Sequence, residues 1–214
     1  MLPKLLRTVF LCLPVVALCC CNGRQQEKPA TATGDTLKLA PTNGYVTSDQ
    51  SPMDISYYPT EFPQHKMAAD GKEAMPVARV IYSRPHKKGR QIFGNSANSL
   101  CVYGRPWRLG ANEATEIEFF VPVLIDGQNV PAGRYILYCI PFSDKWTLAL
   151  NRNIDSWGLA IDSSKDVLRT ELPVMQQAPP VEDFTMVFKA ASTGADLIMA
   201  WDGVRTVLPL TFTQ

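Results

Sequence analysis

The residues most able to do chemistry gather in one short stretch that combines cationic, aromatic and acidic side chains. Guanidinium groups recognise a carboxylate or phosphate through paired hydrogen bonds, and an indole ring stacks on sugar rings or apolar groups. Gly110 lets the backbone turn sharply within the stretch. We therefore expect a loop that presents these groups to a ligand. The members of this polar cluster are Arg105, Trp107, Arg108, Asn112 and Glu113, with Arg84 and Arg90 upstream.

Glu113 is the candidate catalytic residue of the cluster, as a general acid or base. Such a role requires a partner carboxylate or nucleophile beside it. The alternative is structural, because an ion pair of Glu113 with Arg108 or Arg84 would close the loop. The sequence leaves both interpretations open.

A second aromatic candidate is Trp157, which precedes Gly158 and follows the polar segment 151–153. An exposed indole at this point can stack on a glycan, whereas Trp146 and Trp201 fall in or beside predicted strands and are expected in the core. The ligand-site hypothesis therefore names six residues: Arg84, Trp107, Arg108, Asn112, Glu113 and Trp157.

The rest of the sequence offers few chemical motifs. The two histidines, the cysteines and the carboxylates show no metal-ligand spacing, and the sequence has neither a nucleophile elbow nor a phosphate-binding glycine loop. We expect no metal and no cofactor. His65 is expected at the surface. His86 lies in the basic turn 84–90, which is either solvated or contacts an anionic lipid or glycan.

The composition is that of a folded, nearly neutral chain. Hydrophobic residues make up 46% and charged residues 19% of the 214 positions. There are 21 basic and 20 acidic residues, which excludes a strongly basic nucleic-acid binder. We expect no nucleic-acid partner.

Short strands separated by turn residues must position the polar cluster. Residues 115–121 alternate apolar and acidic side chains, Asp126-Gly127 marks a hairpin, and Trp201–Val204 marks another. Prolines 52, 59 and 63 exclude a long helix, so we expect residues 45–71 to pack as an extended segment on the domain edge. The pattern predicts an all-β fold, an antiparallel β-sandwich or barrel-like sheet pair. About nine strands are expected, at 77–83, 115–121, 123–125, 135–140, 146–150, 166–171, 183–189, 196–201 and 204–212.

The N-terminus has the pattern of a bacterial lipoprotein signal. Lys4 and Arg7 precede an apolar segment, Val9–Leu18, that is too short to span a bilayer. Leu18 is followed by three cysteines, and we expect cleavage before Cys21, which would carry the lipid. Cleavage before the preceding cysteine and an ordinary cleaved signal peptide are the alternatives.

This pattern divides the chain into three parts: a signal peptide (1–20), a flexible tether from lipidated Cys21 (21–44) and a single β domain (45–214). Acyl chains on Cys21 would attach the protein to a membrane of the cell envelope. No acidic run follows Cys21, so we expect an outer-membrane anchor that faces the periplasm.

Two cysteines fall within the predicted β domain, Cys101 and Cys139. An exported compartment permits a disulfide between them. Two buried free thiols are the alternative.

Several short motifs occur together in the chain from about residue 52 onward: Val80–Pro85, Lys88–Arg90, Ile92–Gly94, Tyr103-Gly104, Trp107–Thr115, Pro131–Gly133, Ile140-Pro141 and Trp157-Gly158. Together they resemble a lipoprotein family, found mostly in Bacteroidota, that is catalogued as domain of unknown function 2911. The resemblance implies an exported β-rich domain and no established activity, substrate or catalytic residue. Family members usually carry a Val-Pro-like pair before the Tyr-Gly motif, where this chain has 100–102, so the resemblance assigns no role to Cys101.

The function expected from these observations is non-enzymatic: a ligand-binding or accessory module of the envelope that takes a small molecule or a glycan. One alternative is a hydrolase of glycan or peptidoglycan fragments that uses Glu113 as acid or base. Another is a structural subunit of an envelope assembly, which would expose a contiguous apolar patch.

Overall fold

The computed structural model of the chain describes residues 49–68 and 75–212, which belong to one compact unit, 47–214. The predicted signal peptide (1–20), the tether from Cys21 (21–44) and the first residues of the predicted β domain (45–48) lie outside the described residues. Within the described part, no helix is long and apolar enough to cross a bilayer.

The first sheet contains six antiparallel strands. In β5, Ile117 and Phe119 are buried while Glu116 and Glu118 are partly exposed, as the alternation predicts. The strands lie in the order β1 (Met53–Tyr58), β2 (Ala78–Ser83), β5 (Glu116–Phe119), β8 (Gly133–Pro141), β9 (Lys145–Asn151) and β10 (Asp166–Pro173).

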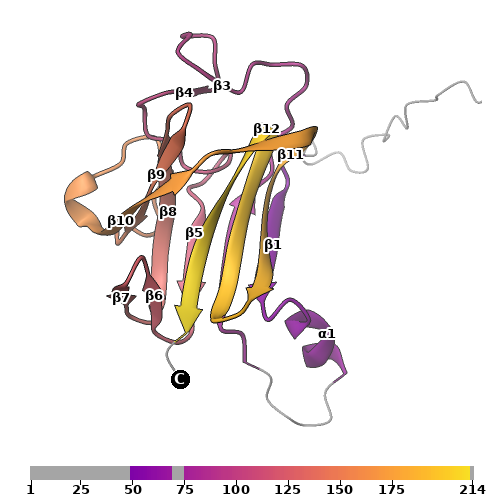
Figure 1. Cartoon of the computed structure of the whole chain (residues 1–214), viewed down its shortest axis with the longest axis vertical. Helices are drawn as coiled ribbons and strands as arrows, with labels where there is room; N and C mark the ends of the chain where they lie inside the picture. Colours follow the sequence, from indigo (N-terminus) through magenta and orange to yellow (C-terminus); the bar gives the residue numbers. More distant parts are fainter. Residues whose placement is uncertain (1–48, 69–74, 213–214) are drawn as a thin grey trace, which may run out of the picture. The chain divides into compact units, whose positions relative to one another are not determined.

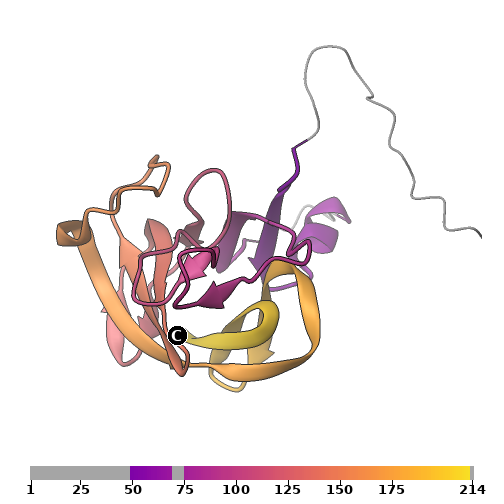
Figure 2. The same cartoon turned by 90° about the horizontal axis from the view of Figure 1, so that it is seen from above.

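The second sheet packs against the first, and the chain passes from β10 into it through Val174 alone (Figures 1 and 2). Its order is β11 (Met175–Ala191), β12 (Gly194–Phe212), β6 (Val123–Ile125) and β7 (Gln128–Val130). A short parallel pair, β3 (Phe93–Gly94) and β4 (Cys101–Val102), lies in the long connection from β2 to β5. The predicted all-β fold is confirmed, and the two sheets form an open sandwich rather than a closed barrel.

The long element β12 reverses direction within itself. Asp202 has a left-handed backbone, with φ 54°, and Phe212 N donates to Thr193 O at 3.3 Å. Gly194 lies against Leu210, because an alanine Cβ there would overlap the Leu210 carbonyl. The two arms of β12 therefore lie side by side, and the second arm pairs with β6. This confirms the hairpin predicted at Trp201–Val204.

The N-terminal segment only partly follows the prediction. Residues 53–58 form the edge strand β1, as expected of an extended segment on the domain edge. The chain then forms a helix of six residues, α1 (Phe62–Met67), which was not expected. Pro63 is compatible with it because proline fits the first helical turn. His65 is exposed on α1, as predicted.

The core fills the space between the two sheets, and Tyr82 connects them. Its ring packs edge-on against Phe184, with centroids 5.6 Å apart. The Tyr82 hydroxyl donates to Asp54 Oδ2 at 3.2 Å in β1 and accepts from Met186 N at 2.9 Å in β11. Burial raises the pKa of Tyr82 to about 12, because a phenolate would lose its hydration there.

Alkaline pH is expected to destabilise the domain through Tyr82. Its pKa is higher in the folded state than the ordinary value of 10.0, so the fold favours the neutral phenol. The resulting stability is fully present below pH 10 and is lost as pH rises through 12, by on the order of 2 kcal/mol. Urea unfolding at pH 9, 10, 11 and 12 measures this loss. In Tyr82→Phe the decline should be shallower, and an unchanged slope would contradict the assignment.

Candidate functional site

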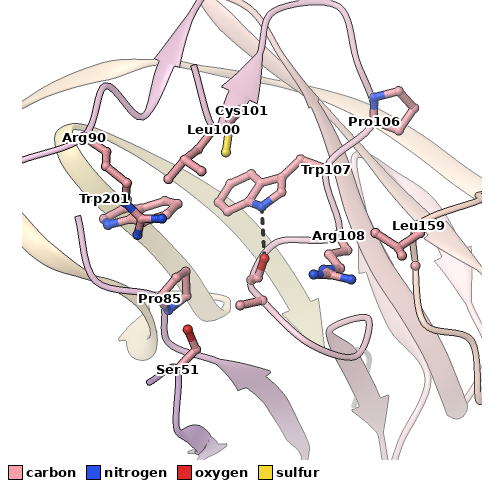
Figure 3. A pocket seen from close by; sticks show the side chains of 13 residues that line it. Ser51, Pro85, Arg90, Leu100, Cys101, Pro106, Trp107, Arg108, Leu159 and Trp201 are labelled. Carbon is pink, nitrogen blue, oxygen red and sulfur yellow. Dashed lines mark hydrogen bonds between the residues drawn. The ribbon is translucent and has the colours of Figure 1, made fainter. Parts of the chain in front are cut away.

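The main candidate site is a cavity of about 350 Å³ at the loop end of the sandwich. Its walls come from the β2–β5 connection (84–115), the β9–β10 loop (152–165), the tip of β12 and Ser51, which precedes β1. Figure 3 shows the side chains that point into it. The lining residues are Ser51, Pro85, Arg90, Leu100, Cys101, Pro106, Trp107, Arg108, Gly110, Ala111, Gly158, Leu159 and Trp201.

Two indole rings form the aromatic floor of this cavity. Trp107 and Trp201 are stacked, with centroids 5.7 Å apart and ring planes at 22°. Trp107 Nε1 donates to Gly110 O at 3.2 Å, and the main chain of Trp107 exchanges two hydrogen bonds with Cys139 in β8. These contacts fix the floor against the first sheet.

Two guanidinium groups lie at the cavity mouth. Arg90 donates through Nε to Lys87 O at 3.0 Å and through Nη2 to His86 O, which holds its plane. Arg108 donates through Nη1 to Trp157 O at 3.2 Å. Partial burial lowers the pKa of Arg108, while the charge of Glu113 acts in the opposite direction. None of the described residues that line the cavity is acidic.

Gly158 locks the β9–β10 loop onto the Arg108 loop. It has φ +75°, and a Cβ there would lie 2.9 Å from the Cβ atoms of both Ala114 and Arg108. Only glycine fits without a shift of these neighbours. The approach brings the Trp157 carbonyl to Arg108, while the residue Trp157 remains 54% exposed.

The cavity brings together only part of the predicted site. Trp107 and Arg108 line it, and the main chain of Trp157 contacts Arg108. Arg84 lies elsewhere: it donates to Asp54 Oδ2 at 3.2 Å and to two groups in β11, Phe184 O at 3.3 Å and Thr185 Oγ1 at 3.2 Å. These bonds give Arg84 a structural role.

Asn112 and Glu113 also lie outside the cavity. The Asn112 amide donates to Asp49 Oδ2 at 2.7 Å and to Ser51 O at 3.4 Å. Glu113 is exposed and borders a separate hollow of about 250 Å³ that Glu116 also lines. In the described part of the chain, Glu113 forms an ion pair with neither Arg84 nor Arg108, so the structure contains neither of the two pairs considered above.

The comparison with protein families identifies the chain. Residues 63–210 match the model of the family described as protein of unknown function, DUF2911. The chain belongs to this family. The match covers every strand except β1 and the last two residues of β12, and it includes both loops at the cavity. Ser51 lies outside it. Neither a curated protein nor a solved structure matches the chain.

Several cavity residues of this DUF2911 domain were not predicted as site residues. Trp201 was expected in the core and is buried there, yet its edge also borders the cavity. Nothing in the sequence around Leu100 and Leu159 marked them as site residues. Arg90 was named upstream of the polar cluster but not among the six predicted site residues. The pairing of its turn with β11 could not be predicted from the sequence.

His86 is not simply solvated in this DUF2911 domain. It forms an isolated β-bridge with Asp183 in β11, and its ring Nδ1 contacts the Asp183 carboxylate. The adjacent Lys87 is paired with Asp202 at the β12 turn. The basic turn is therefore attached to the second sheet by side chains on both residues.

Cys101 and Cys139 are free, buried thiols. Burial raises the pKa of both, and for Cys139 the neighbouring Cys101 adds to the effect. The thiolate is the nucleophilic form, so Cys101 is poorly suited to attack a ligand although it borders the cavity. Among the described residues, no three His, Cys, Asp or Glu side chains are grouped to hold a metal ion.

Unfolding measurements should separate the two arginines. Arg84→Met removes bonds to both β1 and β11 and leaves the Phe184 carbonyl without its donor, so we expect a loss of about 1–3 kcal/mol. Arg108→Met removes one long hydrogen bond and relieves a partly buried charge, so we expect a change within about 1 kcal/mol. Urea denaturation of both variants measures the free energies of unfolding. A larger loss for Arg108→Met would mean that Arg108 stabilises the fold rather than serving a ligand site.

Proposed function

We propose that this chain is an exported, lipid-anchored protein of the cell envelope whose β domain binds a small anionic ligand and does not act as an enzyme. One observation carries the ligand proposal: Arg90 and Arg108 lie at the mouth of one cavity, and no acidic side chain is among its described lining residues. Arginine forks are suited to carboxylate and phosphate groups.

The surroundings of the two arginines support this proposal. The cavity volume lies within the range of small-molecule sites. The guanidinium of Arg108 is partly buried. Among the described residues, the charge that acts on its pKa is that of the exposed Glu113, with which it forms no ion pair. An incoming anion would compensate this desolvated charge. The indole of Trp107 offers a flat surface beside it.

Anion binding can be tested on the purified protein with inorganic phosphate, sulfate and acetate. We expect saturable stabilisation of the parent in a thermal-shift titration, since a ligand that binds only the folded state raises its stability. Arg90→Met and Arg108→Met should each weaken binding at least about tenfold. Lys66→Met on the exposed helix α1 removes a charge far from the lining and is the matched control. Equal binding by all four proteins, or no binding by the parent, would contradict the proposal.

The export and anchoring part of the proposal is supported by the sequence alone, through Lys4, Arg7, Val9–Leu18 and the cysteines that end in Cys21. Cys21→Ser should move the protein from the detergent phase to the aqueous phase in a two-phase extraction. Protease treatment of intact cells should leave the β domain uncut if the anchor faces the periplasm. Digestion of the domain would place it on the cell surface.

A hydrolase that uses Glu113 is the second candidate, favoured by one observation. Glu113 and Glu116 line the same hollow, and most glycosidases use a pair of carboxylates for catalysis. However, Glu116 is engaged by Arg134 at 2.6 Å. Release of reducing ends from peptidoglycan fragments, lost in Glu113→Gln, would support this function over simple binding.

A further inference from the structure

The mouth of the cavity combines its two cations with exposed apolar side chains. Leu100 is 44% exposed and Leu159 is 77% exposed, and both line the cavity with the arginines. Figure 3 shows Leu100 with Arg90 on one side of the Trp107 ring, and Leu159 with Arg108 on the other. A single exposed leucine is unremarkable on a protein surface, but here each leucine stands beside a cation at the opening of one aromatic-floored cavity.

This pattern limits the ligand to a narrow chemical class. A purely inorganic anion would engage the arginines and leave the leucines and the indole floor in water. An uncharged apolar molecule would cover the apolar groups and leave two cations partly desolvated without a counter-ion, which is unfavourable.

A neutral sugar also fits the lining poorly. Ser51 supplies the only hydroxyl among the described lining residues. The indole N–H groups of Trp107 and Trp201 already donate to Gly110 O and Glu182 O. A sugar ring presents many hydroxyl groups that each need a partner when they are buried. Beyond the two guanidinium groups, the described lining side chains offer few such partners.

We infer that the ligand is an amphiphilic anion, whose carboxylate or phosphate binds at the arginines of the cavity mouth, Arg90 and Arg108, and whose apolar chain or ring lies over Leu100, Leu159 and the Trp107 indole. This inference rests on the proposed function, since it assigns the class of ligand at the same cavity. Two sources share this chemistry: a dissolved amphiphile such as an alkyl phosphate, and the headgroup region of an anionic lipid in a membrane.

The test is a chain-length series on the purified protein. Inorganic phosphate and methyl, butyl, hexyl and octyl phosphate are titrated below the concentrations at which they form micelles. Each buried methylene should strengthen binding by about three- to fourfold until the apolar wall is covered. Octanol, which has the chain without the charge, should bind at least about tenfold more weakly than octyl phosphate.

Matched variants assign the two halves of the ligand. Arg90→Met and Arg108→Met should weaken every member of the series by a similar factor. The double variant Leu100→Ser and Leu159→Ser should leave inorganic phosphate binding unchanged and flatten the gain per methylene. Val187→Ser is the control, because Val187 is 43% exposed on β11 and does not line the cavity.

Vesicles distinguish the two sources of the amphiphile. The flotation test uses the unlipidated Cys21→Ser protein, because acyl chains would bind either vesicle. Its flotation with phosphatidylglycerol vesicles but not phosphatidylcholine vesicles, lost when the double leucine substitution is added, would support the class with a lipid headgroup as its source. A gain per methylene with dissolved alkyl phosphates would support the class with a free ligand. If inorganic phosphate binds as tightly as octyl phosphate and neither vesicle binds, the inference is overturned and the anion site stands. If no anion of any kind binds, both proposals are overturned.

Discussion

Gly194→Ala is expected to destabilise the domain by about 3 kcal/mol, whereas Gly203→Ala in the same hairpin should change stability by less than about 1 kcal/mol. Both glycines belong to β12, so the two substitutions have the same chemistry and nearly the same place in the sequence. They differ in what surrounds the added methyl group.

At Gly194, the new Cβ would overlap the Leu210 carbonyl oxygen and lie 3.0 Å from Leu210 C and 3.1 Å from Thr211 Cα. All three are main-chain atoms of the second arm of β12, so no side chain can rotate away. The arm would have to shift, although it is also held by β6. At Gly203, nothing lies within 4 Å of the new Cβ, and the backbone is not left-handed.

Urea denaturation followed by circular dichroism gives both free energies of unfolding. If Gly194→Ala were as stable as the parent, the two arms of β12 would not be in contact, and the antiparallel reversal at Asp202 would be wrong. If Gly203→Ala were as damaging as Gly194→Ala, the turn rather than the contact between the arms would be the sensitive feature.

The fold was largely predictable because strands and turns depend on local patterns. The alternation of apolar and acidic residues in 115–121 correctly predicts which side chains of β5 are buried. Asp126-Gly127 correctly marks the β6–β7 hairpin. The elements that were missed are short. β3 and β4 have two residues each, too few for any alternation, and β3 and β4 pair through contacts that the sequence does not record.

The site was only partly predictable because it depends on which residues meet from distant parts of the chain. Arg84 and Asn112 looked available, but their partners Asp54 and Asp49 lie in the N-terminal segment, 30 and 63 residues away. Leu159 reaches the cavity only because Gly158 packs against the Arg108 loop. Such long-range contacts have no local signature.

Arg108 and Glu113 show the same limit over a short distance. They are five positions apart in the sequence and have opposite charges, which favours the prediction of an ion pair. Between them, Leu109 and Asn112 have left-handed backbones, with φ of 56° and 57°. The loop therefore turns, so that Arg108 lines the main cavity and Glu113 lines the separate hollow. Backbone conformations of this kind are uncommon for residues other than glycine.

The largest loss of stability is expected from Trp146→Ala, about 3–5 kcal/mol. Trp146 is 1% exposed and lies beneath the cavity floor. Its ring contacts Phe93 with centroids 5.4 Å apart, and it meets Trp107 edge-on at 5.7 Å. Truncation removes a large buried ring and leaves a void that the two sheets cannot fill without moving.

Trp157→Ala is the matched control and should change stability by less than about 0.5 kcal/mol. The contact of Trp157 with Arg108 runs through its main-chain carbonyl, which the substitution keeps, and Trp157 is 54% exposed. Urea unfolding should be followed by far-ultraviolet circular dichroism, because both variants lose a fluorescent ring. If Trp146→Ala does not fold, Trp146→Phe should still be measurably less stable than the parent. Equal losses for Trp146→Ala and Trp157→Ala would mean that the aromatic floor of the cavity is not part of the core, and an anion site built on that floor would lose its rigid support.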